Sequence, residues 1–134
     1  MKLTFSWNRT QVRTAFALCT SDGENAAAVS PLAHLLDDDG GLGIDHAIRW
    51  IDEGKKLALA SLQGVPGPLR WAREYFCAEM DGDRTIAMSG GDPACRQVVT
   101  TRSFLGALET WQAFLAAGPT GVPRTVDVQA LGGS

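Results

Sequence analysis

The stretch REYFCAEMDGDRTIAMS, residues 73–89, places an Asp-Gly pair between two runs of β-forming residues. Asp-Gly is a favoured two-residue loop of a β-hairpin, because both positions of its type I′ turn need a positive φ. With Asp81 and Gly82 as the loop, the predicted register sets Glu79 opposite Arg84, a pair of opposite charge. The same register gives two apolar pairs, Cys77 with Ile86 and Tyr75 with Met88. Both faces of the hairpin are fairly apolar, so we expect it inside a sheet and not at its edge.

A short strand and a capped helix are predicted after this hairpin. We expect the strand at residues 96–100 and the helix at residues 102–117. Thr101 suits the N-cap of this helix, and Gly118-Pro119 supplies its stop. The helix carries one apolar stripe, formed by Phe104, Leu108, Trp111 and Leu115. Because such a stripe has to pack on the sheet, Trp111 is predicted to be a core residue.

The N-terminal part of the chain is predicted to start with β-structure. Apolar and polar residues alternate over residues 2–7, which indicates a half-buried strand. Residues 11–20 fit either a strand or a helix, and their β-branched residues favour the strand. A turn is expected at residues 21–25, where Asp, Gly and Asn cluster.

Two helices and a further strand are expected before the hairpin. Ser30 as N-cap and Pro31 at the first helical position begin a short helix that ends near residue 37. A second helix is predicted at residues 44–53, where Gly54 closes it. Leucine and alanine alternate over residues 55–62, which predicts a strand there.

The length of 134 residues suits one domain with a core that needs neither disulfides nor metal. We place this domain at residues 1–118. Residues 119–134 are rich in Gly and Pro without an apolar period, so a loosely ordered tail is expected there. The order of elements predicts an α+β fold: a mainly antiparallel sheet, arranged as a meander, with helices packed on one face.

Several classes of protein are disfavoured by the composition. No apolar run approaches the roughly 20 residues of a membrane span. The N-terminal segment also lacks the apolar core of a signal peptide, so a cytoplasmic protein without membrane contact is expected. Three widely spaced cysteines without a Cys-x-x-Cys pair predict reduced thiols and neither disulfides nor a zinc site.

Charge is distributed unevenly along the chain. Residues 22–53 hold eight acidic residues against Arg49 alone, a net charge of −7, whereas the remaining residues carry +4. This asymmetry disfavours nucleic acid as a partner and favours a basic protein. The three consecutive aspartates, Asp37 to Asp39, are the densest part of the acidic region.

No catalytic, metal-binding or cofactor-binding motif is recognisable. His34 and His46 lie on different predicted elements, so with Asp37–Asp39 they do not form a metal-ligand grouping. Cys77 falls in the middle of a strand and is interpreted as a core residue, not a nucleophile. The run Gly40–Gly43 precedes a helix, but it lacks the Lys-Ser/Thr of a phosphate-binding loop and follows three aspartates. We therefore predict no enzyme, no cofactor and no metal.

Two segments resemble the small, acidic immunity proteins of bacterial polymorphic-toxin and contact-dependent growth inhibition systems. They are VVTTRSFLGALETWQAFL at residues 98–115 and IDHAIRWIDEG at residues 44–54. The resemblance implies a non-enzymatic, cytoplasmic protein that binds and neutralises one cognate toxin domain, with an acidic patch over a basic cleft. The predicted partner-binding surface consists of Asp37, Asp38, Asp39, Asp45, Trp50, Asp52 and Glu53. Trp50 is expected to be its exposed aromatic anchor.

Two other classes of function stay open from the sequence. The first is a small-molecule-binding or enzymatic α+β domain, with a pocket between sheet and helices that Tyr75, Cys77 and Trp111 would line. The second is a structural subunit, which self-association in solution would reveal.

Overall fold

The computed structural model describes residues 1–9, 15–22, 29–92, 94–119 and 122–131. These residues form two antiparallel sheets and three helices, so the predicted α+β class is confirmed. In chain order the elements are β1 (Lys2–Arg9), β2 (Ala15–Ser21), α1 (Pro31–Asp37), α2 (Ile44–Leu62), β3 (Leu69–Ala72), β4 (Phe76–Asp81), β5 (Arg84–Ser89), β6 (Arg96–Thr100), α3 (Thr101–Ala117) and β7 (Arg124–Asp127).

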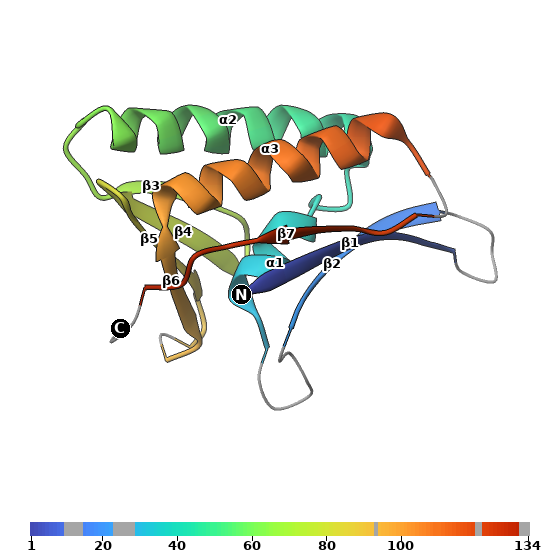
Figure 1. Cartoon of the computed structure of the whole chain (residues 1–134), viewed down its shortest axis with the longest axis horizontal. Helices are drawn as coiled ribbons and strands as arrows, with labels where there is room; N and C mark the ends of the chain where they lie inside the picture. Colours follow the sequence, from blue (N-terminus) through green and yellow to red (C-terminus); the bar gives the residue numbers. More distant parts are fainter. Residues whose placement is uncertain (10–14, 23–28, 93, 120–121, 132–134) are drawn as a thin grey trace.

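The two sheets lie below a pair of helices. Strands β4, β5 and β6 form the predicted meander, and β3, which the sequence did not indicate as a separate strand, pairs with β4 at its edge. A second sheet has the order β2-β1-β7. Figure 1 shows α2 and α3 side by side above both sheets, with α1 between the sheets. Helix α1 contacts β2 on one side and β4, β5 and β6 on the other, so its apolar residues close the space between the sheets. Within the described part of the chain, no helix is both long and apolar enough to cross a bilayer.

The β4–β5 hairpin lies inside its sheet, as predicted, but its register differs from the prediction. Asp81 pairs with Arg84 and Glu79 pairs with Ile86, so the loop consists of Gly82 and Asp83. Gly82 supplies the positive φ, 59°, that a two-residue loop needs at its first position. Because the shift is two residues, each side chain keeps its predicted face.

Hydrogen bonds of Asp83 explain why the hairpin loop consists of Gly82 and Asp83 and not of Asp81 and Gly82. Its backbone carbonyl accepts a hydrogen bond from Thr101 N at 3.1 Å, and its Oδ1 accepts one from Arg102 N at 3.1 Å. These are backbone groups of the first turn of α3, which have no partner within the helix. The hairpin loop therefore supplies hydrogen-bond acceptors for the first N–H groups of α3. The turn residues alone do not indicate this tertiary contact.

Helix α2 is longer than predicted. It continues through Gly54 to Leu62, so the predicted helix end at Gly54 and the predicted strand at residues 55–62 are wrong. Lysine, leucine and alanine dominate residues 55–62 and are strong helix formers, and Ala58 and Ser61 extend the buried stripe at helical spacing. Gly54 is present because its Cα approaches the ring of Trp71: a Cβ there would lie 2.7 Å from Trp71 Cε2.

The ends of α1 and α3 follow the predicted chemistry closely. Helix α1 begins after Ser30, whose side chain accepts from Ala33 N, as predicted. The N-cap of α3 is Thr100 and not Thr101: Thr100 Oγ1 accepts from Ser103 N at 3.1 Å. Gly118, with φ 81°, ends the helix as expected.

Thr101 instead makes a buried side-chain contact. Its Oγ1 lies 2.7 Å from Thr85 Oγ1, and both residues are fully buried. We expect Thr101→Val to lower the free energy of unfolding by about 1–3 kcal/mol, because the hydroxyl of Thr85 is left buried without a partner. In the double variant with Thr85→Val, the free energy of unfolding should fall by less than the sum of the decreases in the two single variants. Thr110→Val, whose hydroxyl bonds to Gly106 O in half-exposed surroundings, is the control in urea denaturation.

The expectation of a loosely ordered tail is wrong for the described residues 122–131. Strand β7 pairs with β1, and Val128 beyond it is 2% exposed. The chain then crosses to the other sheet, where Thr100 N donates to Gln129 O at 3.0 Å and Leu131 N donates to Val98 O at 2.8 Å. The segment thus joins the outer edges of both sheets, because its valines alternate with polar residues despite the surrounding Gly and Pro.

The strands predicted for the N-terminal segment are confirmed over the residues that the structure describes. Strand β1 covers the predicted residues 2–7, with Leu3 and Phe5 fully buried. Residues 15–21 are a strand, the alternative that was favoured for residues 11–20. Residues 10–14 and 23–28, part of that segment and of the expected turn, lie outside the described residues.

Candidate functional site

The acidic loop between α1 and α2 separates two hollows of the surface. Successive residues of this loop point alternately toward one hollow and toward the other. Asp37, Asp39, Gly41 and Gly43 line a cavity beside β2 and α3, whereas Asp38, Gly40 and Leu42 line a second depression with Arg73, Glu74 and Tyr75. The three consecutive aspartates, predicted as one patch, are therefore divided between two sites.

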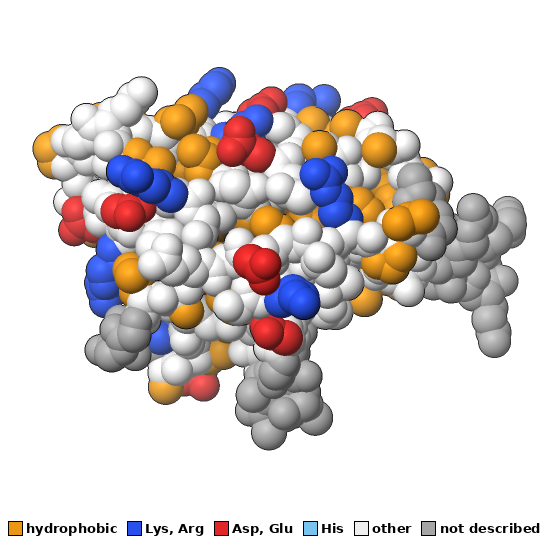
Figure 2. Space-filling model, viewed as in Figure 1, with side chains coloured by type: hydrophobic (Ala, Val, Ile, Leu, Met, Phe, Trp, Pro, Cys, Tyr) orange, Lys and Arg blue, Asp and Glu red, His pale blue; other side chains and the backbone are white. Residues whose placement is uncertain are grey.

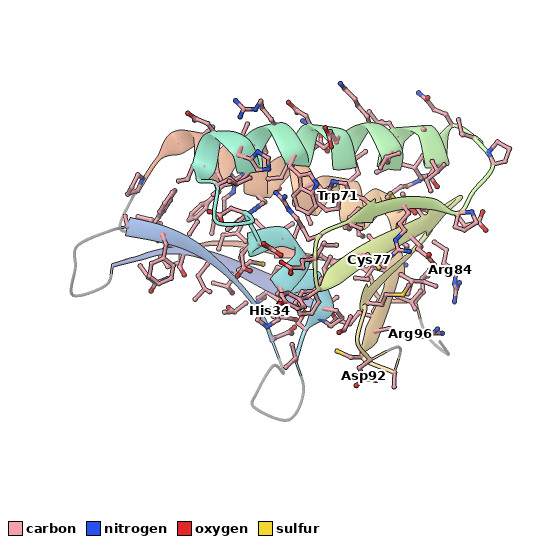
Figure 3. The ribbon with its side chains drawn as sticks, turned by 180° about the vertical axis from the view of Figure 1, so that it is seen from behind. His34, Trp71, Cys77, Arg84, Asp92 and Arg96 are labelled. Carbon is pink, nitrogen blue, oxygen red and sulfur yellow. The ribbon has the colours of Figure 1, made fainter. Side chains whose placement is uncertain are left out.

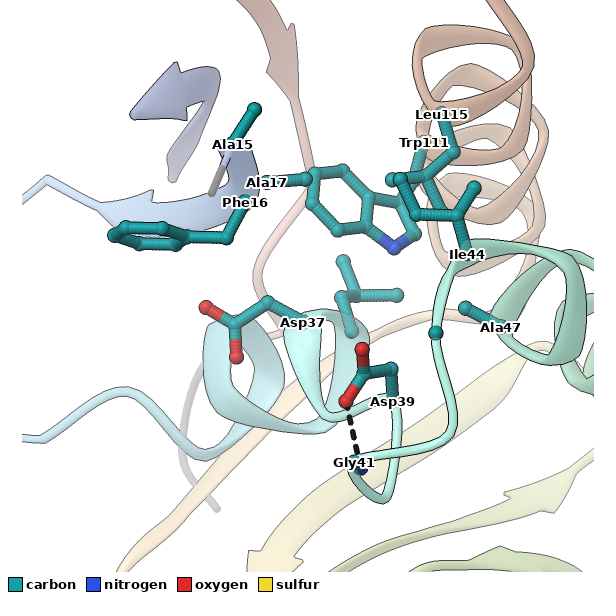
Figure 4. A pocket seen from close by; sticks show the side chains of 12 residues that line it. Ala15, Phe16, Ala17, Asp37, Asp39, Gly41, Ile44, Ala47, Trp111 and Leu115 are labelled. Carbon is teal, nitrogen blue, oxygen red and sulfur yellow. Dashed lines mark hydrogen bonds between the residues drawn. The ribbon is translucent and has the colours of Figure 1, made fainter. Parts of the chain in front are cut away.

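The cavity lies where β2, α1, α2 and α3 meet, and its volume is about 410 Å³. Its floor is apolar and is formed by the buried side chains of Leu36, Ala47, Trp111 and Leu115. Phe16 at 41% exposure and the carboxylates of Asp37 and Asp39 lie at its mouth (Figure 4). A volume of this size falls in the lower part of the range for small-molecule sites, roughly 300–1,000 Å³.

The polar group on the floor is the indole N–H of Trp111. The residue is 2% exposed, and its Nε1 has no hydrogen-bond partner among the described residues. Figure 4 shows this nitrogen turned toward the cavity, while the ring packs at 4.9 Å from Phe5, between ring centroids. An unpaired buried donor costs about 1–3 kcal/mol. An acceptor that enters the cavity would recover that cost.

Backbone hydrogen bonds hold the two carboxylates in place. Asp37 Oδ2 accepts from Cys19 N at 3.2 Å, which joins α1 to β2. Asp39 Oδ1 accepts from Gly41 N at 2.7 Å, the contact drawn in Figure 4. The lining residues of the cavity include two carboxylates and no Lys or Arg within the described ranges. The carboxylate of Asp39 therefore favours a positively charged group at this mouth.

The glycines of this loop have a conformational role. Gly40, Gly41 and Gly43 have φ values of 65°, 74° and 91°, a region that other L-residues rarely adopt. This backbone bends the loop around the cavity mouth. The glycines thus have a conformational reason to be present in this loop.

Comparison of the chain with protein-family models, with curated proteins and with solved structures finds no match. The function has to be inferred from the sites themselves.

Trp50 is not an exposed anchor, and that prediction is wrong. It is 9% exposed and stacks on Trp71 with a centroid separation of 3.8 Å. The guanidinium of Arg73 lies 3.7 Å above its ring, a cation–π contact. Trp71 is a residue of β3, and its side chain lies on the side of that strand that faces the helices (Figure 3). Because α2 continues past Gly54, its buried stripe runs through Ala47, Trp50 and Gly54, which turns Trp50 inward.

The remaining acidic residues of the predicted surface lie on α2. Asp45, Asp52 and Glu53 are exposed. Asp52 Oδ1 accepts from Gln112 Nε2 at 2.7 Å and lies 3.9 Å from Lys55 Nζ, so it is tied to α3 and partly neutralised. Acidic and basic side chains lie among one another on the face shown in Figure 2. On that face there is no continuous acidic surface over the described residues.

The alternative pocket predicted from the sequence is not assembled as expected. Tyr75 is 66% exposed beside the second depression, and Cys77 is 3% exposed within the β3–β6 sheet (Figure 3). Of that set, Trp111 lines the cavity and Tyr75 lines the second depression, so the three residues do not share one site. His34 stacks on Phe76 at 5.4 Å between ring centroids. The described residues contain no group of three or more His, Cys, Asp or Glu that could hold a metal ion.

Sequence reasoning missed Phe16 and Leu36 as cavity residues and Leu42 and Tyr75 as exposed apolar side chains. Leu42 was detectable, since it stands alone among glycines and aspartates in a turn and has no apolar stripe to join. Phe16 and Leu36 carry no local signal, because the cavity forms only when four elements meet.

Proposed function

We propose that this protein is a non-enzymatic immunity protein of a bacterial toxin system, which binds and neutralises a basic toxin domain in the cytoplasm. The proposal keeps the predicted class of partner and moves the binding surface to the α1–α2 loop and the neighbouring β3–β4 loop. We name this the loop surface and define it as Asp38, Leu42, Asp45 and Tyr75.

The observation that carries the proposal is the combination of apolar and acidic groups at this surface. Leu42 and Tyr75 are each 66% exposed, and they line one depression together with Asp38. Exposed aromatic side chains within a charged rim are typical of protein interfaces. Tyr75 takes the role of anchor that Trp50 was expected to have.

The charge of the surface supports a basic partner. Asp38 Oδ1 accepts from Gly40 N at 2.8 Å, so the carboxylate is fixed by the backbone, and Asp45 stands exposed in the first turn of α2. Glu74 lines the same depression as a further acidic group, against one basic group, Arg73, whose guanidinium lies over the ring of Trp50. An excess of fixed negative charge raises the association rate with a positively charged partner. Because a toxin cleft that binds nucleic acid is basic, such a surface would cover it.

The first test is co-expression with the toxin domain encoded beside this chain. Growth arrest by that domain should be relieved, and the two proteins should copurify. Tyr75→Ala is expected to weaken binding by about 30-fold or more, as for a central aromatic anchor. Val65→Ala, an exposed apolar residue in the loop after α2, is the control. Unrelieved arrest by every neighbouring domain would contradict the proposed function.

A second test addresses the charge of the loop surface. Asp38→Lys with Asp45→Lys is expected to lower the association rate by about 10- to 100-fold at low salt, with a smaller loss at high salt. Glu109→Lys with Asp127→Lys makes the same change in net charge at exposed positions of α3 and β7 and should have a much smaller effect. Equal losses for the two pairs, measured by stopped-flow kinetics, would show that net charge and not this surface matters.

A further inference from the structure

We infer that the cavity between β2, α1, α2 and α3 binds an organic cation: an ammonium or guanidinium group on an apolar body that also carries a hydrogen-bond acceptor. This site is separate from the loop surface of the proposed function. Asp39 and Gly41 of the acidic loop line the cavity, whereas Asp38 and Leu42 belong to the loop surface. Three features specify the chemistry of the ligand.

The first feature is the apolar floor, which requires an apolar body. Leu36, Ala47 and Leu115 are buried around the cavity, and Phe16 adds an aromatic ring at its mouth. Transfer of apolar surface from water to such a site is favourable by about 25 cal/mol per Å². The volume of about 410 Å³ accepts a small aromatic or branched aliphatic group.

The second feature is the indole N–H of Trp111, which requires an acceptor. The side chain is buried and fixed by ring contacts with Phe5 and Phe114, so it cannot turn its nitrogen to solvent without leaving the core. Its Nε1 has no partner in the described part of the chain. A carbonyl, ether or hydroxyl oxygen of the ligand would satisfy this donor.

The third feature is the carboxylate of Asp39, which requires a cation. One of its oxygens accepts from Gly41 N, and its other oxygen has no partner among the described residues. A charge-assisted hydrogen bond to an ammonium group is roughly twice as strong as a neutral one. A neutral ligand of the same shape should therefore bind more weakly.

Two sources can supply this chemistry: a free small amine, or a lysine side chain of a bound protein. Two probes distinguish them. The first, 4-methoxyphenethylamine, has an aromatic body, an ether oxygen and an ammonium group. The second, Nα-acetyl-lysinamide, presents a lysine side chain with amide carbonyls. The neutral control is 2-(4-methoxyphenyl)ethanol, in which a hydroxyl replaces the ammonium group.

The experiment is a titration of the ¹⁵N-labelled full chain, followed through the four tryptophan indole N–H signals. The signal of Trp111, assigned by its loss in Trp111→Phe, should shift in a saturable way, while those of Trp50 and Trp71 should stay within error. Calorimetry should show about tenfold weaker binding of the amine to Asp39→Asn and a similar loss for the neutral alcohol. Asp45→Asn, which removes the same charge from an exposed position outside the cavity, should change affinity less than about twofold.

Each outcome decides the inference. A saturable shift with the aromatic amine alone supports a free amine as the ligand. A shift with the lysine derivative alone, or with both probes at similar affinity, supports a protein side chain. No shift of the Trp111 signal with either probe, or equal affinity for the amine and the alcohol, would overturn the inference. These results are independent of whether any toxin domain binds.

Discussion

Gly54→Ala is expected to lower the free energy of unfolding by about 2–3 kcal/mol, although alanine is the better helix former by about 1 kcal/mol. Gly54 lies in the middle of α2, where a change to alanine normally stabilises a helix. Here the added Cβ would lie 2.7 Å from Trp71 Cε2 and 2.9 Å from Cζ2, well inside van der Waals contact. The steric cost outweighs the gain in helix propensity.

The ring of Trp71 has little freedom to move away. Its Nε1 donates to Trp50 O at 3.2 Å, and its face stacks on Trp50 at 3.8 Å between centroids. On the far side of Trp50 lies the guanidinium of Arg73. A shift of Trp71 would therefore disturb the whole stack, including the β3–β4 loop that carries Arg73.

Gly106→Ala in α3 is the matched control. It also changes a glycine within a helix, but apart from its chain neighbours and the backbone of its own helix no described atom lies within 4 Å of the added Cβ. This variant is expected to be more stable by about 0.5–1 kcal/mol. Urea denaturation with unchanged slope for both variants would measure the two effects. A Gly54→Ala protein as stable as the unmodified chain would contradict the close packing of α2 on Trp71.

Local patterns predicted the elements whose determinants are adjacent in sequence. The Ser30-Pro31 start of α1, the β6 strand and the stripe of α3 are where we expected them. The hairpin kept its faces although its register moved by two residues, since burial depends only on the parity of the shift. Burial of Trp111 followed from the same periodicity.

The errors on α2 share a physical cause, because the course of this helix depends on a residue distant in sequence. Gly54 looks like a helix stop until Trp71 is placed against it. Trp50 looks exposed on a helix that ends early, and it is buried on one that continues. The aspartate triplet looks like one acidic patch, but the positive φ values of the following glycines set alternate residues on opposite sides of the loop. No local window of the sequence contains the contact between Gly54 and Trp71, whereas the division of the aspartates follows from glycines that lie next to them.

A chain that ends at Gly118 is expected to lose about 4–6 kcal/mol of stability, a large share of the roughly 5–15 kcal/mol of a typical domain. The removed segment contains β7, which pairs with β1 from Lys2–Asp127 to Phe5–Arg124, and the buried Val128. A buried valine contributes about 1.5–3 kcal/mol and each backbone hydrogen bond about 0.5–1.5 kcal/mol. Met1 also loses two hydrogen bonds with Val128, one donated by its amino group at 3.1 Å and one accepted by its carbonyl at 2.7 Å.

The consequences should extend to the cavity. Without β7, β1 becomes an edge strand. Phe5 of β1 supports the ring of Trp111 at 4.9 Å, so loss of β7 should broaden the Trp111 indole signal and weaken amine binding. A chain that ends at Leu131 keeps every contact described for this segment and should match the full chain in thermal denaturation. A chain ending at Gly118 that melted within a few degrees of the full protein would contradict this prediction. In that case β7 would contribute little to stability, and the Gly/Pro-rich segment would be dispensable for the fold.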